Sequence, residues 1–326
     1  MLDSNDRTID YLRISLTERC NLRCRYCMPE EGIKNIGHDR ILTLEQVFRL
    51  VKIAAGVGFK KVRLTGGEPL VRKNIAKLIA DIASLPEIED ISMTTNGLLY
   101  ADMAEELRDA GLKRINISLD TMHPEKYRYI TRGGEYKYAQ RAIFKALELQ
   151  MNPVKLNVVA IKGFNDNEVL DFAELAYKYP LHVRFIEFMP IGDLDFYSQE
   201  KFIGIDAIRE KIEQKYELTN DKVVTGSGPA KYYNITGGQG SLGFISPISH
   251  HFCHKCNRIR MTANGKLRSC LYYENEIDLQ MALLNEQSDD KLRRLFIKAI
   301  ETKPGHHQME NGWGSDNYRK MCQIGG

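Results

Sequence analysis

Residues 11–27 read YLRISLTERCNLRCRYC, in which a run of strand-forming residues leads directly into a loop with three cysteines. The run Tyr11–Thr17 is rich in β-branched and aromatic residues, which is typical of a strand. The cysteines stand at Cys20, Cys24 and Cys27. The stretch therefore predicts a first strand whose carboxyl end opens into a loop of candidate metal ligands.

The same alternation continues to about residue 215, because short β-branched runs recur and a helical pattern follows each of them. The predicted strands are Tyr11–Thr17, Lys61–Thr65, Ile88–Thr94, Arg114–Asp120, Val154–Ile161 and His182–Met189. The predicted helices are Leu44–Ala55, Asn74–Ala83, Ala101–Ala110, Lys137–Gln150, Asn167–Lys178 and Ile205–Lys215. Thr43 with Gln46 predicts a capping box, and Gly56 and Gly111 predict helix ends. Strands alternating with such helices indicate βαβ units and a parallel sheet.

Polar or cysteine-bearing segments stand at the ends of nearly all the predicted strands, among them Gly66-Gly67-Glu68-Pro69 and Thr94-Thr95-Asn96-Gly97. A doubly wound sheet binds its ligand mainly at one switch point, whereas a βα barrel builds its site from many strand ends. We therefore expect an α/β fold with an incomplete (β/α)6 barrel, similar to a TIM barrel, over residues 1–218. The Gly-, Thr- and Tyr-rich composition after residue 215 marks the start of a C-terminal region, residues 219–326, in which a polar helical pattern is predicted over Ile277–Ile300.

The composition excludes several classes of protein. The 326 residues are 43% hydrophobic and 27% charged, which rules out a disordered chain, a collagen-like repeat and a coiled coil. The net charge of +3 argues neither for nor against nucleic acid. The sequence shows no signal peptide and no membrane span, so we expect a cytoplasmic protein with reduced thiols. Its seven cysteines therefore need a reason other than disulfides.

Six of the cysteines form two groups of three, Cys20/Cys24/Cys27 and Cys253/Cys256/Cys270. Structural zinc takes four nitrogen or sulfur ligands, so the first group lacks a partner. The second group leaves zinc open as an alternative, since His250, His251 and His254 lie beside it. A [4Fe–4S] cluster held by three thiolates keeps one iron open. Such an iron can bind the amino and carboxylate groups of S-adenosylmethionine (SAM), whose reductive cleavage releases a 5′-deoxyadenosyl radical.

Cys20-x3-Cys24-x-Tyr26-Cys27 resembles the signature of the radical SAM superfamily, in which an aromatic residue precedes the third cysteine. Gly66-Gly67-Glu68-Pro69, after the second predicted strand, is similar to the motif that contacts the methionine amino group in that superfamily. Beside the second cysteine group, Arg258 and Arg260 alternate on an extended segment, so both guanidiniums can face one ligand. Arginine binds phosphate through bidentate hydrogen bonds, which favours a nucleotide as the substrate.

Together these motifs resemble the GTP 3′,8-cyclase family of molybdenum cofactor biosynthesis. The likeness extends over CNLRCRYCMPEEG, VRLTGGEPL, TTNG, NISLD, RFIEFMP, FCxxCNRIR and the final Ile-Gly-Gly. It implies two [4Fe–4S] clusters, one on each cysteine group, with the second cluster binding the guanine ring. It implies that SAM contacts Tyr26, Gly67, Ser118 and Met189. It implies that GTP contacts Arg13, Arg63, Thr94, Lys155, Arg258 and Arg260, with Lys61 and Arg184 as weaker candidates.

The implied reaction is radical cyclisation of GTP to (8S)-3′,8-cyclo-7,8-dihydroguanosine 5′-triphosphate, catalysed by a lyase. Arg258, Arg260 and a C-terminal tail ending in Gly325 and Gly326 complete the site in the family. The resemblance also implies a flavodoxin- or ferredoxin-type electron donor, a functional link to cyclic pyranopterin monophosphate synthase, and a homodimer. Inward-facing charges around a barrel channel agree with a triphosphate, which needs paired cations when buried.

Other interpretations of the sequence remain. The nearest is another radical SAM enzyme with an auxiliary cluster, such as a peptide-modifying maturase, although such enzymes carry more C-terminal cysteines. A metal-binding module that contacts RNA requires a larger basic excess, so we expect no nucleic-acid partner, and a plain electron-transfer protein needs no open iron. Cys322 lies outside the family pattern, and we expect it to be incidental or to approach the second cysteine group if the tail enters the site.

Overall fold

The computed structural model describes residues 1–33, 37, 40–191, 194–220, 228–309 and 319–325. Its framework is a series of parallel strands, each followed by helical structure. The strands are β1 Tyr11–Ser15, β2 Lys61–Thr65, β3 Asp90–Thr95, β4 Arg114–Ser118, β5 Val154–Ala160 and β6 Leu181–Glu187. The helices between and after them are α1 Leu44–Val57, α2 Ile75–Ala83, α3 Tyr100–Asp109, α4 Pro124–Thr131, α5 Tyr136–Glu148, α6 Val169–Lys178 and α7 Ile205–Glu213.

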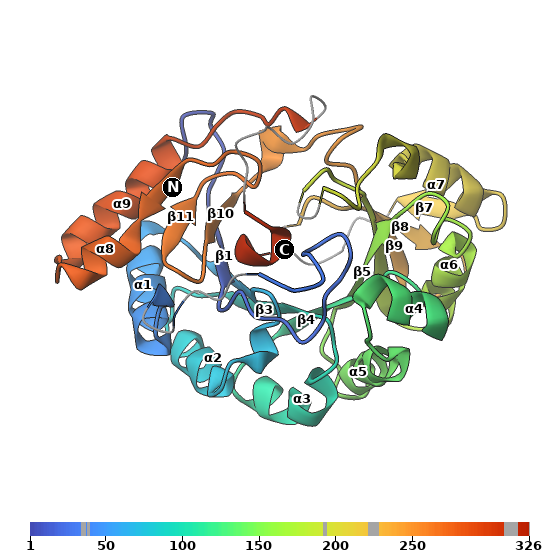
Figure 1. Ribbon diagram of the computed structural model, residues 1–326, viewed down its shortest axis with the longest axis horizontal. Helices are drawn as coiled ribbons and strands as arrows, with labels where there is room; N and C mark the ends of the chain where they lie inside the picture. The colour runs from blue at the N-terminus through green and yellow to red at the C-terminus, as the bar shows by residue number, and fades with distance from the viewer. Residues whose placement is uncertain (34–36, 38–39, 192–193, 221–227, 310–318, 326) are drawn as a thin grey trace.

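These six strands follow one another in the sheet in the order of the sequence, β1-β2-β3-β4-β5-β6. The order never reverses, so the sheet has no switch point of the doubly wound kind. Figure 1 shows the strands curving around a central space with the helices outside them. Among the described residues the sheet has twelve strands, and its two end strands, β12 Glu276–Asp278 and β7 Leu218–Asn220, do not pair with each other. The architecture is therefore an α/β fold consistent with the partial barrel that the sequence predicts.

Segments of the C-terminal region extend this sheet at both edges. On one side, β9 Ser241–Ile245 pairs in parallel with β6, and β8 Lys231–Ile235 and β7 Leu218–Asn220 follow in antiparallel pairing. On the other side, β10 Arg258–Met261 pairs in parallel with β1, followed by β11 Lys266–Arg268 and β12 Glu276–Asp278. The second cysteine group therefore adjoins β10, and β10 pairs with β1, the strand that precedes the first cysteine group.

The helices bury one apolar stripe against the sheet. In α1, the buried residues include Leu50, Val51 and Ala54, which recur at the spacing of one helical face. The predicted capping box at Thr43 is confirmed, with Gln46 N donating to Thr43 Oγ1 at 3.2 Å. The prediction that Gly56 ends this helix is wrong, because the helix continues to Val57 and the left-handed cap is Gly58 (φ 113°).

The helical pattern predicted over 277–300 divides into three elements. Strand β12 comes first, then α8 Leu279–Leu284, and then α9 Asp289–Glu301, which packs against α1. Ser288 caps α9 by accepting from Lys291 N. No helix in the described part of the chain is long and apolar enough to cross a membrane.

Candidate functional site

One cavity runs along the inside of the barrel, with the first cysteine group toward the carboxyl ends of the strands and the second toward the amino end of β10. Its wall also includes most of the predicted ligand contacts, namely Arg13, Tyr26, Arg63, Gly67, Thr94, Ser118, Arg184, Met189, Arg258 and Arg260. Segments more than 200 residues apart in sequence therefore meet at one site. The placement follows from the fold, since Cys20 follows the carboxyl end of β1 whereas Cys256 precedes the amino end of β10, the parallel strand beside it.

The first cysteine loop rests directly on the glycine loop after β2. Gly67 N donates to Thr17 O at 2.7 Å, and Glu68 N donates to Arg19 O at 2.8 Å. A Cβ atom at position 67 would lie 2.3 Å from Arg19 O, so any larger residue would push the two loops apart. Gly67 thus permits a close backbone approach between the two loops, which fixes the position of the cysteine loop at the end of the barrel.

Glu68 links this pair of loops to the loop after β3. Its carboxylate is fully buried and accepts from Thr95 Oγ1 at 2.7 Å, from Asn96 N at 2.7 Å and from Leu70 N at 3.2 Å. Burial nevertheless raises the pKa of Glu68 to about 7. Asn96 in turn donates from Nδ2 to Cys20 Sγ at 3.7 Å. The sequence identified the glycine motif but not this organising role of its glutamate.

The thiols of the first group lie in an environment that disfavours free thiolates. Burial raises the pKa of Cys20 to about 12, and it also raises the pKa of Cys24 well above the ordinary thiol value. Among the described residues, no three His, Cys, Asp or Glu side chains converge on a point where one metal ion would sit. Cys20, Cys24 and Cys27 all line the same cavity, so the three thiols could together hold a cluster.

Tyr26 is held in place by Asp120, at the end of β4. The phenol donates to Asp120 Oδ2 at 2.7 Å, and Val159 N donates to Asp120 Oδ1 at 2.9 Å. Burial raises the pKa of Asp120 to about 6. Ser118, at the end of β4, and Met189 line the same part of the cavity. Asp120 was visible in the sequence only as part of a polar strand end.

Arginines line up across three neighbouring strands. In the parallel register, Arg13 on β1 lies opposite Arg260 on β10 and opposite Arg63 on β2. Cross-strand neighbours point to the same face of a sheet, so the three guanidiniums face the barrel interior together. Burial, together with the charges of neighbouring arginines, lowers the pKa of Arg63 and of Arg260 to about 10. We call Arg13, Arg63 and Arg260 the arginine row.

More polar groups continue the cavity toward β5 and β6. Arg184 Nη2 donates to Asn116 Oδ1 at 2.6 Å. Within the described residues, Thr94 Oγ1, Asn157 Oδ1 and Arg184 Nε are buried and make no hydrogen bond. Such atoms are costly unless a ligand satisfies them, and all three residues line the cavity. Lys155 is buried nearby with its ammonium 5.2 Å from the Tyr232 ring centroid, although it does not line the cavity.

The second cysteine group sits beside β10 and is supported from both ends of the chain. Arg7 Nη1 donates to Cys253 O at 2.8 Å. Lys303 Nζ donates to Arg258 O at 2.8 Å and to Ser269 O at 2.5 Å, and it also bonds the thiol of Cys256. Burial opposes ionisation of Cys256, but Arg258 and Lys303 outweigh it and lower the pKa of this thiol to about 6. No motif in the sequence pointed to Arg7 or Lys303.

Two of the predicted positions need separate mention. Lys61 does not line the cavity, because its ammonium pairs with Asp10 at 2.6 Å near the amino end of β2. It shares a face with Arg63 but lies one layer lower in the barrel. Gly326 lies outside the described residues.

The described part of the tail enters the barrel, as Figure 1 shows. Gly325 O accepts from Arg13 Nη2 at 2.8 Å and from Arg260 Nη1 at 3.3 Å. Gly325 has φ +78°, and a Cβ atom there would lie 3.0 Å from Thr65 Cγ2. Glycine therefore fits both the conformation and the narrow space.

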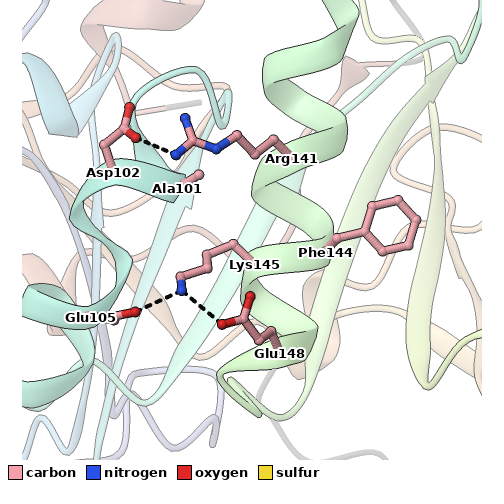
Figure 2. Close-up of a pocket in the computed structure, with 7 residues that line it drawn as sticks. All are labelled: Ala101, Asp102, Glu105, Arg141, Phe144, Lys145 and Glu148. Atoms are coloured by element: carbon pink, nitrogen blue, oxygen red, sulfur yellow. Dashed lines mark hydrogen bonds and ion pairs between the residues drawn. The ribbon is translucent and has the colours of Figure 1, made fainter.

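A second hollow lies on the outside of the protein, between α3 and α5. Figure 2 shows that its charged side chains are joined to one another. Arg141 pairs with Asp102 at 2.6 Å, and Lys145 pairs with Glu105 at 2.7 Å and Glu148 at 2.9 Å. Because these exposed groups neutralise one another, the hollow offers no comparable ligand chemistry.

Comparisons with known proteins match this description. The Radical SAM superfamily matches residues 14–176, and the family Molybdenum Cofactor Synthesis C matches residues 181–309. A protein of Syntrophomonas wolfei named GTP 3′,8-cyclase is 59% identical over 326 residues, covering both chains completely. One of Desulforamulus reducens with the same name is 52% identical, again over both whole chains.

Among solved structures, SuiB of Streptococcus suis bound to SAM matches with a TM-score of 0.56 at 15% identity. The match covers 88% of this chain and 65% of the SuiB chain, and it supports the fold. The partial barrel with its three-cysteine loop is thus that of a radical SAM protein, a class that implies one [4Fe–4S] cluster and SAM. Within that class, the chain belongs to the GTP 3′,8-cyclase family.

Proposed function

We propose that this chain is a GTP 3′,8-cyclase, a radical SAM lyase that performs the first step of molybdenum cofactor biosynthesis. The observation that carries the proposal is the arginine row, which lies in one cavity with two separate groups of three cysteines. One triplet suits a cluster that activates SAM, the other suits a second cluster, and the cations between them suit a triphosphate.

The first site is assigned to Cys20, Cys24 and Cys27, which would hold a [4Fe–4S] cluster with one iron left for SAM. When bound, this pair supplies a 5′-deoxyadenosyl radical after one-electron reduction. We assign SAM contacts to Gly67, Ser118 and Met189 and to Tyr26, whose orientation Asp120 fixes. The tight seating of the cysteine loop on Gly67 keeps these groups at a constant position.

GTP is assigned to the space between the two cysteine groups. Its triphosphate carries about four negative charges, and such a group is buried favourably only among cations. The arginine row, Arg184, Arg258 and Lys155 supply them, and Thr94 offers a buried hydroxyl that no described residue bonds. The assignment does not extend to Lys61, whose ammonium is bonded to Asp10.

The second [4Fe–4S] cluster is assigned to Cys253, Cys256 and Cys270, with its open iron toward the guanine. Lys303 supports this choice, because its ammonium bonds the Cys256 thiol and the backbone beside the other ligands. A cation beside a thiolate favours the deprotonated form that iron binds. Zinc with a histidine stays the alternative for this site.

The substrate steps balance as an isomerisation of GTP. The hydrogen at ribose C3′ leaves as an atom and ends in 5′-deoxyadenosine, C3′ bonds to C8 of guanine, and one electron from the donor and one proton then restore a closed-shell product. The residues bind and orient GTP, so that C3′ faces SAM while the base stays fixed. Gly325, held by Arg13 and Arg260, closes the site and excludes water, and Gly326 follows it.

The remaining assignments concern organisation and partners. Residues 1–218 would form the radical SAM core, and residues 219–326 would supply the second cluster and GTP contacts. A flavodoxin- or ferredoxin-type protein would supply electrons, a cyclic pyranopterin monophosphate synthase would consume the product, and the enzyme would act as a homodimer.

The test is anaerobic turnover with reductant, SAM and GTP, followed by chromatography and mass spectrometry of the nucleotides. We expect a product isomeric with GTP, formed together with 5′-deoxyadenosine. Cys20→Ala should abolish both, whereas Cys256→Ala should abolish the GTP isomer and keep some SAM cleavage. Cleavage that never depends on GTP would overturn the proposal and favour a peptide-modifying enzyme.

A further inference from the structure

Cys322 is the one cysteine that the proposed function leaves without a role. It lies in the last turn of the chain, Met321–Gln323, and is 2% exposed. The expectation that it approaches the second cysteine group is wrong, because its thiol forms a hydrogen bond with the thiol of Cys27. It also lines the same cavity as Cys20 and Cys24. Four thiols therefore gather at the first site.

Contacts on both sides of Cys322 fix its position. Gln323 Nε2 donates to Glu18 Oε2 at 3.3 Å, and Arg319 lies 3.8 Å from Glu18 Oε1. Glu18 precedes Cys20 by two residues, so the tail is tied to the cysteine loop itself. Beyond Cys322, Gly325 O is held by Arg13 at 2.8 Å. The contact with Cys27 is thus anchored at two points.

We propose that Cys322 is a removable fourth thiolate ligand of the first cluster, which closes the open iron when SAM is absent. The inference rests on the cluster that the radical SAM class implies and not on GTP as the substrate. As the S–Fe bond forms, the thiol releases one proton. When the amino and carboxylate groups of SAM bind the iron, that bond breaks and the thiolate takes a proton back, with no change in oxidation state.

The chemistry of the site favours such a ligand. Thiolate is the usual ligand of iron in [4Fe–4S] clusters, and a fully ligated cluster leaves no iron open to solvent or oxidants.

The experiment compares the parent enzyme with Cys322→Ser and Cys322→Ala in thiol-free anaerobic buffer. Electron paramagnetic resonance (EPR) is recorded on the reduced protein before and after SAM is added. The change on adding SAM isolates the first cluster, because SAM does not bind the second. We expect the variants to differ from the parent without SAM and to match it with SAM. Met321→Leu serves as the control for a change in the same turn and should resemble the parent throughout.

Two further readouts do not depend on spectra. If nine in ten parent molecules hold the thiolate, SAM should bind about tenfold more tightly to Cys322→Ala. A chelator should remove iron faster from Cys322→Ala than from the parent, and SAM should abolish the difference. Parent and variant signals that coincide without SAM, together with equal SAM affinity, would overturn the proposal. A Cys27–Cys322 disulfide in protein with its full iron content would overturn it as well.

Discussion

Replacing Arg63 by methionine is predicted to stabilise the substrate-free protein while weakening its binding of GTP. Arg63 lies beside Arg13 in the arginine row. Burial, together with the charges of Arg184 and Arg114, lowers its pKa to about 10. A fall of that size from the ordinary arginine value corresponds to about 3 kcal/mol of unfavourable free energy in the folded state.

The substitution also removes a hydrogen bond, from Arg63 Nε to Ser92 Oγ at 3.2 Å. This loss subtracts about 1 kcal/mol, and Ser92 keeps its contact with Val62 O. The net gain of about 2 kcal/mol should raise Tm by about 2–6 °C. Loss of one charge-assisted contact with phosphate should weaken GTP binding by about 10- to 100-fold.

Both effects are measured on the anaerobic holoenzyme, by scanning calorimetry without substrate and by titration with GTP. The matched control is Lys60→Met, which removes an exposed cation next to the start of the same strand. Lys60 pairs with Glu89 at the surface, so neither Tm nor GTP affinity should change. A lower Tm for Arg63→Met would contradict the claim that the buried charge of Arg63 destabilises the substrate-free protein. An unchanged GTP affinity would contradict the claim that Arg63 binds the substrate.

Three further predictions follow from the site. Gly67→Ala should reduce iron content and SAM binding by tenfold or more, as measured by iron analysis and SAM titration. Gly56→Ala is the control and should reduce neither, because a Cβ atom at Gly56 meets no described atom within 4 Å. Burial and the charges of Arg184 and Arg114 lower the pKa of Lys155 to about 6, so Lys155 is neutral at pH 7.5 and should take up a proton when GTP binds. Calorimetry in buffers of different ionisation enthalpy measures this uptake, and Lys155→Met should abolish it. Deletion of Gly325 and Gly326 should preserve iron content but reduce cyclisation by at least a hundredfold, and normal turnover of the truncated protein would contradict the role assigned to the tail.

Much of the barrel was predictable because its strands alternate clearly with helices. The bounds predicted for β2, Lys61–Thr65, are those observed. Helix α4, Pro124–Thr131, was missed because its sequence PEKYRYIT has little apolar periodicity. The helical prediction over 277–300 missed a strand and a turn, because residues 276–278 become a strand only by pairing with β11 in the folded chain.

The sequence predicted the residue types of the site. It did not predict which of these residues line the cavity or which other residues hold them in place. Alternation on β2 shows that Lys61 and Arg63 face the same way, yet only the fold shows that Lys61 bonds Asp10 and does not line the cavity. Lys303 is far in sequence from the thiol that it bonds, so no spacing could indicate it. The path of the tail, which brings Cys322 to Cys27, is likewise a tertiary property.

The central claim is tested most directly by deuterium transfer from GTP labelled at ribose C3′. The reconstituted enzyme is given reductant, SAM and labelled GTP without oxygen, and 5′-deoxyadenosine is analysed by mass spectrometry. The account predicts one deuterium in the 5′-deoxyadenosine, formed only when GTP is present. Unlabelled 5′-deoxyadenosine that forms equally without GTP, from protein confirmed to contain iron and sulfide, would contradict it.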